Sequence, residues 1–212
     1  MEKEELKRLT TLATCVALAR NQEFYIPAAV SARHIHLSAA DRDALFGSGY
    51  ALKKLRPLSQ PGQYACEEKL AVVGPKGRID GVRILGPERP DTQVEISMTD
   101  TFASGIAPVV RMSGDIAGTP GCKLVGPKGE VALQKGVIVA ARHLHMSTAE
   151  AAAYGLKNGD VVSACKRGVR ETVLSSILVR AGEGHSLELH IDTDEANAAA
   201  IKNGDLLELV KK

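Results

Sequence analysis

The sequence contains no tryptophan, and aromatic residues make up only 3% of it. Proteins commonly hold single-stranded nucleic acids by stacking the bases on aromatic side chains, so this scarcity argues against such a partner. The formal net charge is only +2, and basic and acidic residues are interspersed along the chain. This balance argues against a charged coat for a nucleic acid or a membrane, although it permits a local basic pocket.

The sequence also lacks any run of about 18 apolar residues, so no membrane-spanning helix is expected. The N-terminal stretch does not have the order of a secretory signal, because its acidic residues come first. The four cysteines are widely spaced, without a Cys-x-x-Cys pair, and we expect reduced thiols rather than disulfides. Together these absences predict a cytoplasmic protein. Its 212 residues are enough for one large domain or two small ones.

Residues 1–22 are predicted to form an amphipathic helix, because apolar residues recur there at helical spacing, at Leu6, Leu9, Leu12 and Val16. One interpretation is a helix that packs on the body of the protein. The alternative is a detachable docking or encapsulation segment that precedes the folded body.

An internal repeat is the most informative feature of the sequence, and repeats decide a fold before other signals do. The segment VSARHIHLS (residues 30–38) recurs as VAARHLHMS (residues 139–147). Within the C-terminal half, the segment that begins HMSTAEAAAYGLKNGD at His145 recurs as HIDTDEANAAAIKNGD at His190. The same frame fits HLSAAD at His36 and EISMTD at Glu95.

Each of these four segments follows strand-like sequence and continues into a pattern typical of a helix N-terminus, with Ser or Asp three residues before an acid. Many short strands with short capping helices favour closed barrels, which leave no exposed sheet edges. We therefore predict a mainly β protein with two related β-barrels from internal duplication. The predicted boundaries are a helix in 1–22, a first barrel in 23–130 and a second barrel in 131–212.

The His-x-His motifs predict metal sites. Alternate side chains of a strand share one face, so His34 and His36 project together, as do His143 and His145. A single such motif often only marks a polar strand face, but two in matching contexts are stronger. The repeat supplies a third ligand for each group, and three ligands with an open fourth position are typical of catalytic zinc. The predicted groups are His34/His36/Glu95 and His143/His145/His190.

Several basic residues are candidates for binding anions. Arg89 precedes Glu95 by six residues, and an arginine fork there could hold phosphate; the alternative is a surface arginine. Lys76 and Arg83 flank glycines in a predicted hairpin, which is either solvated or a clamp for a polyphosphate ligand. Arg33 and Arg142, next to the histidines, are expected to brace the barrels.

The motifs VSARHIHLS, PLSQPGQYACEEKLAVVGPKGRI, RILGPERPDTQVEIS and VIVAARHLHMS together resemble the phosphate propanoyltransferase family. These enzymes are the phosphotransacylases of propanediol degradation in bacterial microcompartments. The resemblance runs from about Tyr25 to the C-terminus and excludes the N-terminal helix. It implies two barrels, two zinc ions per chain, and conversion of acyl-CoA and phosphate to acyl phosphate and coenzyme A.

Transferred by motif, the family's metal ligands fall on the two groups named above, and its phosphate-binding arginine falls on Arg89. The coenzyme A contacts that the resemblance implies are Val30, Ser31, Ala32, Lys76, Arg83 and Asn197. The implied partners are acyl-CoA and phosphate, and we also expect a homodimer. The N-terminal helix is a candidate for contacts with microcompartment shell or cargo proteins.

The mechanism that we expect is direct attack of phosphate on propanoyl-CoA or acetyl-CoA at a di-metal site, because no activated serine or cysteine is evident that could form an acyl-enzyme. Two alternatives remain open at this stage. One is a zinc-dependent acyl-CoA hydrolase, and the other is a non-catalytic, shell-associated metal-binding module. A requirement for phosphate and turnover of acyl-CoA would separate them.

Overall fold

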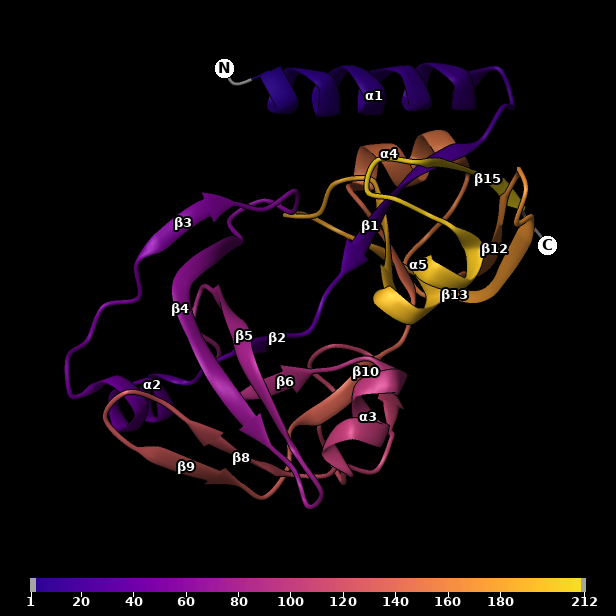
Figure 1. Cartoon of the computed structure of the whole chain (residues 1–212). Coiled ribbons are helices and arrows are strands. Elements are labelled where there is room, and N and C mark those ends of the chain that lie inside the picture. Colours follow the sequence, from indigo (N-terminus) through magenta and orange to yellow (C-terminus); the bar gives the residue numbers. More distant parts are fainter. Residues whose placement is uncertain (1–2, 211–212) are drawn as a thin grey trace. The chain divides into compact units, whose positions relative to one another are not determined.

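The structure is a computed structural model that describes residues 3–210, and within this range it contains five helices and fifteen strands (Figure 1). The outermost residues of the predicted helix and of the predicted second barrel lie outside the described residues. The chain forms two compact units: one runs up to Ser31 and resumes at Arg142, and the other is Ala32–Ala141. No helix of the described part is long and apolar enough to cross a membrane.

The first unit is a closed barrel in which the strand order is β1-β14-β11-β13-β12-β15. Closure gives every strand two hydrogen-bonded neighbours, so no edge is left exposed. Its core includes Leu144, Leu189 and Val179, which are completely buried. The strands are β1 (Tyr25–Ser31), β11 (His143–Met146), β12 (Val161–Lys166), β13 (Thr172–Ala181), β14 (Glu188–Asp192) and β15 (Leu206–Val210).

The second unit is a nine-stranded sheet in the order β7-β10-β6-β2-β5-β4-β8-β9, with β3 paired to β4. The long strand β4 is visibly curved, so the sheet curls around its own core, which includes Ile35, Ile84 and Val94 (Figure 1). The strands are β2 (His34–His36), β3 (Lys54–Pro57), β4 (Tyr64–Val73), β5 (Arg78–Gly86), β6 (Gln93–Glu95), β7 (Val110–Arg111), β8 (Cys122–Val125), β9 (Glu130–Leu133) and β10 (Val137–Ala140). The predicted fold class, mainly β with two barrel-like units, is confirmed.

The division of the chain differs from the predicted boundaries after residues 22 and 130. Strand β1 pairs with β14 and β15, so it completes the barrel of the C-terminal half. Strand β10 pairs with β6 and β7, so it belongs to the second unit. The physical reason is that the chain changes units just before each His-x-His motif. The preceding strand, β1 or β10, is still hydrogen-bonded in the earlier unit, and the motif itself lies in the other unit. A repeat in the sequence does not reveal such an exchange.

Helices follow the ligand-bearing strands directly, as the capping pattern predicts. The side chains of Ser97, Ser147 and Asp192 each accept a hydrogen bond from the backbone N–H of the residue three positions further along. The acidic side chain of that residue in turn accepts the backbone N–H of the capping residue. Ser38 likewise accepts the N–H of Asp41. Each such cap stabilises its helix by about 1 kcal/mol. The helices are α2 (Ala39–Phe46), α3 (Met98–Ser104), α4 (Thr148–Tyr154) and α5 (Thr193–Ala199).

Arg33 and Arg142 brace their units, as expected. The guanidinium of Arg33 donates to Asp100 at 3.0 Å, and that of Arg142 donates to Glu195 at 2.6 Å. Both acids are the third residues of capped helices, α3 and α5. Each arginine therefore ties the strand of one half-repeat to the helix of the other.

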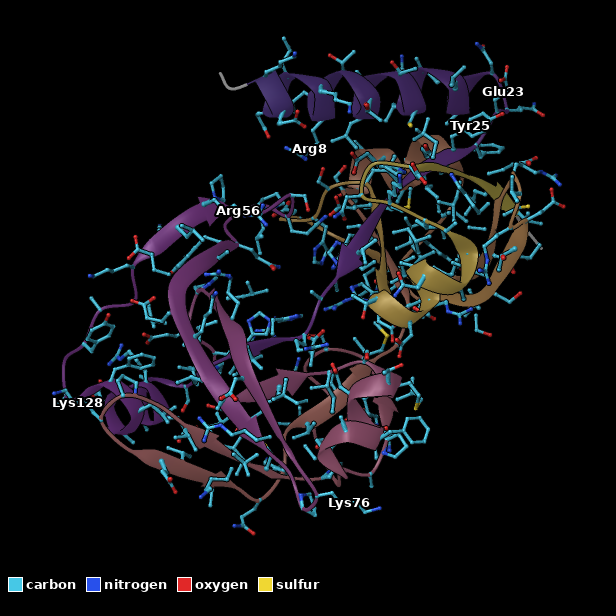
Figure 2. All side chains as sticks on the ribbon, viewed as in Figure 1. Arg8, Glu23, Tyr25, Arg56, Lys76 and Lys128 are labelled. Atoms are coloured by element: carbon cyan, nitrogen blue, oxygen red, sulfur yellow. The ribbon has the colours of Figure 1, made fainter. Side chains whose placement is uncertain are left out.

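The N-terminal helix α1 (Lys3–Arg20) packs on the first unit, where it contacts α4 and β1 (Figure 1). Its buried face consists of Leu12, Cys15 and Ala19, at helical spacing. Leu6 and Leu9 stay 51% and 42% exposed, so the packed face is rotated away from the predicted stripe. Arg8, labelled in Figure 2, donates to Ser186 at 3.5 Å and to Glu5. Packing on the body is thus confirmed.

Tyr154 provides a test of the packing between α4 and β1. Its side chain is completely buried, and its hydroxyl donates to the Tyr25 carbonyl at 2.5 Å. We expect Tyr154→Ala to lower the free energy of unfolding by about 3–5 kcal/mol, because a large cavity remains. Tyr154→Phe should cost about 1 kcal/mol for the lost hydrogen bond. Denaturant unfolding measures both, with the fully exposed Val169→Ala as control; equal stability of Tyr154→Ala and this control would contradict the packing.

Candidate active site

The first predicted metal group comes together on two adjacent strands of the second unit. In the antiparallel pair β2–β6, His34 lies directly opposite Glu95, and their Nε2 and Oε2 atoms are 3.5 Å apart. His36 follows two residues later on β2, and its ring centroid lies 5.0 Å from that of His34. All three side chains are buried, and their ligand atoms lie within 4.8 Å of one another.

The second group repeats this arrangement in the first unit. In the antiparallel pair β11–β14, His143 lies directly opposite His190, and His145 follows on β11. The Nε2 atoms of His143 and His145 are 3.1 Å apart. The His190 ring lies 5.1 Å from that of His143 and 4.9 Å from that of His145. Each predicted group of three is therefore a real cluster in space.

Burial and charge set the protonation of the first group. Burial alone would raise the pKa of Glu95, but the charge of His34 and hydrogen bonds from His34 and Ser113 outweigh it and lower that pKa well below its usual range. Burial alone would lower the pKa of His34, yet the Glu95 carboxylate raises it overall. Burial lowers the pKa of His36 to about 3, helped by the charges of His34 and Arg89. His36 is thus a neutral imidazole beside a carboxylate.

Both groups fit a transition-metal ion. In the second group, the Nε2 atoms of His143 and His145 face each other at 3.1 Å, so an ion could be shared between these two nitrogens. In the first group, His34 turns its Nε2 toward Glu95, because its Nδ1 contacts the Ala32 carbonyl. The pKa of His145 is lowered mainly by burial, which keeps this ring neutral as well. Neutral imidazoles with or without one carboxylate are the donors that zinc and similar metals prefer.

Arg89 lies beside the first group and is held by its backbone and its side chain. Its N–H donates to the Leu37 carbonyl at 2.9 Å, one residue after the His-x-His motif. Its Nη1 donates to Ser113 Oγ at 3.0 Å, and Ser113 Oγ donates to Glu95 Oε1 at 2.9 Å. A single hydroxyl therefore connects the guanidinium to the Glu95 carboxylate.

Two partners of Glu95 were missed by the sequence analysis. Gln93 Nε2 donates to Glu95 Oε1 at 2.6 Å and also to Ser113 Oγ at 2.9 Å. The Gln93 side-chain oxygen accepts the N–H of Gly114 at 2.7 Å. Alternation along β6 could have found Gln93, which shares the face of Glu95. Ser113 has no such signal, because it lies 18 residues further along, after β7.

The second group also has partners outside the predicted set. Glu188 lies opposite His145 in the β11–β14 pair, and its Oε2 is 2.8 Å from His190 Nε2. Alternation on β14 could have found it, since His190 is two residues away. His185, which falls outside the repeat frame, has its ring centroid 4.4 Å from that of His145. Burial lowers the pKa of His185, aided by the charges of Arg180 and His190.

The residues that the resemblance implies for coenzyme A lie on several elements. In the first unit, Val30 and Ser31 end β1, the Val30 N–H donates to Asn203 at 2.7 Å, and Asn197 lies on α5. In the second unit, the Ala32 carbonyl accepts from His34 Nδ1 at 2.8 Å.

The two cations of this set share the β4–β5 hairpin. Lys76, labelled in Figure 2, lies at the hairpin turn, where its N–H donates to the Ser104 carbonyl. Arg83 lies opposite His34 in the β2–β5 pair, and its Nη1 donates to the Cys66 carbonyl at 2.6 Å. The five residue steps of β5 from Arg78 to Arg83 alone span roughly 16 Å, at about 3.3 Å per residue. This spacing suits an extended ligand.

The chain is similar to known proteins over most of its length. The sequence pattern of the family described as phosphate propanoyltransferase matches residues 27–202. A phosphate propanoyltransferase of Thermotoga maritima is 50% identical over 160 residues, which cover 75% of this chain and 76% of that protein. One from Priestia megaterium is 52% identical over 163 residues, 77% of this chain and 75% of that protein.

A third relative, the phosphate propanoyltransferase of Citrobacter koseri, is 46% identical over 183 residues, 86% of this chain and 87% of that protein. The matched range begins inside β1 and ends just after α5, so it contains both predicted metal groups and Arg89. With half-identical relatives and a family match over most of its length, the chain belongs to the phosphate propanoyltransferase family of enzymes.

Proposed function

We propose that this enzyme transfers an acyl group between coenzyme A and phosphate, with a zinc ion held by each of the two metal groups. The observation that carries the proposal is the chain of contacts from Arg89 through Ser113 to Glu95. It sets a permanent cation beside a buried carboxylate and two imidazoles. A guanidinium presents a planar fork of donors that matches phosphate oxygens, which supports phosphate binding at this position.

Each group offers three protein ligands, His34/His36/Glu95 and His143/His145/His190, which leaves a coordination position for substrate. When bound, zinc supplies Lewis-acid chemistry toward thioester carbonyl and phosphate oxygens. Arg89 binds phosphate and neutralises part of its charge. Gln93 and Ser113 fix the orientation of Glu95, so that the ligand set is preorganised rather than assembled on binding.

In the proposed reaction, a phosphate oxygen attacks the thioester carbon, the carbon–sulfur bond breaks, and its electron pair leaves on the sulfur of coenzyme A. An acyl-enzyme would need an activated nucleophile. Burial raises the pKa of Cys66 to about 11 and that of Cys122 to about 12, so these thiols stay protonated. Ser113 already donates to Glu95. Direct transfer to phosphate is therefore the favoured route.

We assign the long coenzyme A molecule to the residues that the family resemblance indicates. Lys76 and Arg83 supply cations for its phosphates, and the separation of these two residues along the hairpin suits an extended ligand. Val30, Ser31 and Ala32 offer backbone groups at and just after the end of β1. Asn197 offers a side-chain amide on α5.

Metal analysis tests the two groups separately. We expect about two zinc ions per folded chain, and about one in the double variant His34→Ala/His36→Ala. The matched variant His143→Ala/His145→Ala should also retain about one. Elemental analysis of the purified proteins gives the ratio, and circular dichroism checks the fold. Two zinc ions in a folded His34→Ala/His36→Ala protein would remove the first group from the proposal.

Kinetics of Arg89→Lys test the phosphate site. A lysine keeps the charge but cannot form a two-pronged hydrogen bond, so KM for phosphate should rise roughly tenfold to a hundredfold. KM for acyl-CoA should change far less. The control is Arg78→Lys, which alters an exposed pair with Asp80 in the same unit. An unchanged phosphate requirement in Arg89→Lys would place this residue outside the site.

The same assay separates the transferase from an acyl-CoA hydrolase. A transferase releases coenzyme A only in the presence of phosphate and forms acyl phosphate in equal amount. Release of coenzyme A that ignores phosphate would identify hydrolysis instead. Comparing propanoyl-CoA with acetyl-CoA in this assay gives the acyl preference.

We further propose that the exposed face of α1 docks on a protein partner, a second copy of the chain or a microcompartment component. Leu6 and Leu9 lie on this face, whereas Leu12 packs in the core. The double variant Leu6→Ser/Leu9→Ser should keep its activity and thermal stability but change its oligomer size in solution or its co-localisation with a shell. Leu12→Ser is the matched control and should lose stability. Unchanged association in both tests would refute docking through this face.

A further inference from the structure

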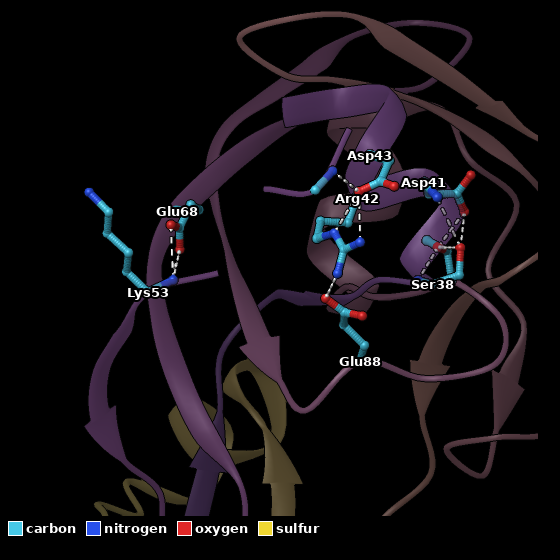
Figure 3. A network of polar contacts seen from close by, with 9 residues as sticks. Ser38, Asp41, Arg42, Asp43, Lys53, Glu68 and Glu88 are labelled. Atoms are coloured by element: carbon cyan, nitrogen blue, oxygen red, sulfur yellow. Dashed lines mark hydrogen bonds and ion pairs between the residues drawn. The ribbon is translucent and has the colours of Figure 1, made fainter. Parts of the chain in front are cut away.

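The segment that carries Arg89 is held by one contact from helix α2 and by two from the residues just before this helix. It is the loop between β5 and β6, residues 87–92, and it has no regular hydrogen-bonding pattern of its own. Arg42 Nη1 donates to Glu88 Oε1 at 2.5 Å (Figure 3). The Arg89 N–H donates to the Leu37 carbonyl, and Thr92 Oγ1 accepts the Ser38 N–H at 2.9 Å.

Arg42 is itself held in place before it reaches the loop. Its Nε and Nη2 donate to Asp43 Oδ1 at 2.9 and 2.7 Å (Figure 3). The same oxygen accepts the N–H of Gly49 at 3.3 Å, beyond the end of α2. The Arg42 side chain is only 17% exposed. The Arg42 guanidinium thus contacts Asp43 on the helix and Glu88 in the loop. Asp43 in turn contacts Gly49 in the turn after the helix.

The two backbone contacts fix where the loop runs, but only the Arg42–Glu88 pair fixes a charged side chain next to Arg89. Glu88 is the immediate neighbour of Arg89 in the chain. Without Arg42, its carboxylate would be free to pair with the Arg89 guanidinium or to repel an incoming phosphate. The pair with Arg42 holds the Glu88 carboxylate in one place.

We propose that Arg42 is a positioning residue for phosphate binding, which acts by holding Glu88 away from Arg89. This inference rests on the proposed role of Arg89. A partly exposed ion pair contributes little to folding stability, so the stability of the fold does not account for the Arg42–Glu88 pair. In contrast, a displacement of about 1 Å at a reacting site can lower the rate by tenfold or more.

The test compares four forms of the full-length, zinc-loaded enzyme: wild type, Arg42→Ala, Glu88→Gln and the double variant Arg42→Ala/Glu88→Gln. Arg42→Ala should raise KM for phosphate roughly tenfold and leave KM for acyl-CoA within about twofold. Glu88→Gln should have a small effect alone. In the double variant it should recover most of the loss, because no free carboxylate remains to compete with phosphate.

A second readout does not depend on turnover. Phosphate should raise the melting temperature of the wild type and of the double variant, and it should do so much less for Arg42→Ala. Lys123→Ala, which removes the exposed Lys123–Glu130 pair in the same unit, is the control for loss of a surface charge. If Arg42→Ala does not fold, Arg42→Gln replaces it with a longer side chain.

Three outcomes would overturn the inference: an unchanged KM for phosphate in folded Arg42→Ala, an equal rise of KM for both substrates, or no recovery in the double variant. The Arg89→Lys kinetics separate this failure from failure of the proposed function. If Arg89→Lys raises KM for phosphate and Arg42→Ala does not, only the role of Arg42 fails. If neither variant does, phosphate binds elsewhere.

Discussion

The site depends on the register of two antiparallel strand pairs. In β2–β6, His34 faces Glu95 while Ile35 faces Val94, and in β11–β14, His143 faces His190 while Leu144 faces Leu189. The four apolar partners are completely buried. A slip by one residue would turn each of them outward and would separate the ligands at the same time. Burial of the apolar pairs therefore fixes the ligand pairs on the opposite face.

The short helices and arginines extend this constraint beyond the strands. Each helix begins within two or three residues of a ligand, because Ser38, Ser97, Ser147 and Asp192 cap it there. Each cap satisfies a backbone amide in the first turn of its helix, where the amides have no partner within the helix. Arg33 and Arg142 then join each His-x-His strand to the opposite helix through Asp100 and Glu195. The ligands consequently stand on a rigid frame rather than on loops, as a preorganised metal site requires.

The sequence alone predicts the ligand groups because the period of a strand and a repeated context both point to the same residues. It also predicts the helix caps, which are local patterns. It could not predict that β1 completes the barrel of the other half, because strand exchange leaves the repeat unchanged. It could not place Ser113 or His185, whose contacts with Glu95 and His145 arise from loops brought close by folding. Long-range contacts of irregular segments carry no periodic signal.

The two groups differ in how the charged side chains around them are connected. In the first, the buried Glu95 carboxylate is met by Gln93, Ser113 and His34, while Arg89 adds a fixed positive charge through Ser113. A divalent cation bound there would leave a clear positive excess, which favours an anion as large as phosphate. In the second, Glu188 Oε2 lies 2.8 Å from His190 Nε2, and Arg180 lies opposite His145 in the β11–β13 pair. In the first group one hydroxyl joins the arginine to the Glu95 carboxylate, and this connection supports the proposal that phosphate binds beside Arg89.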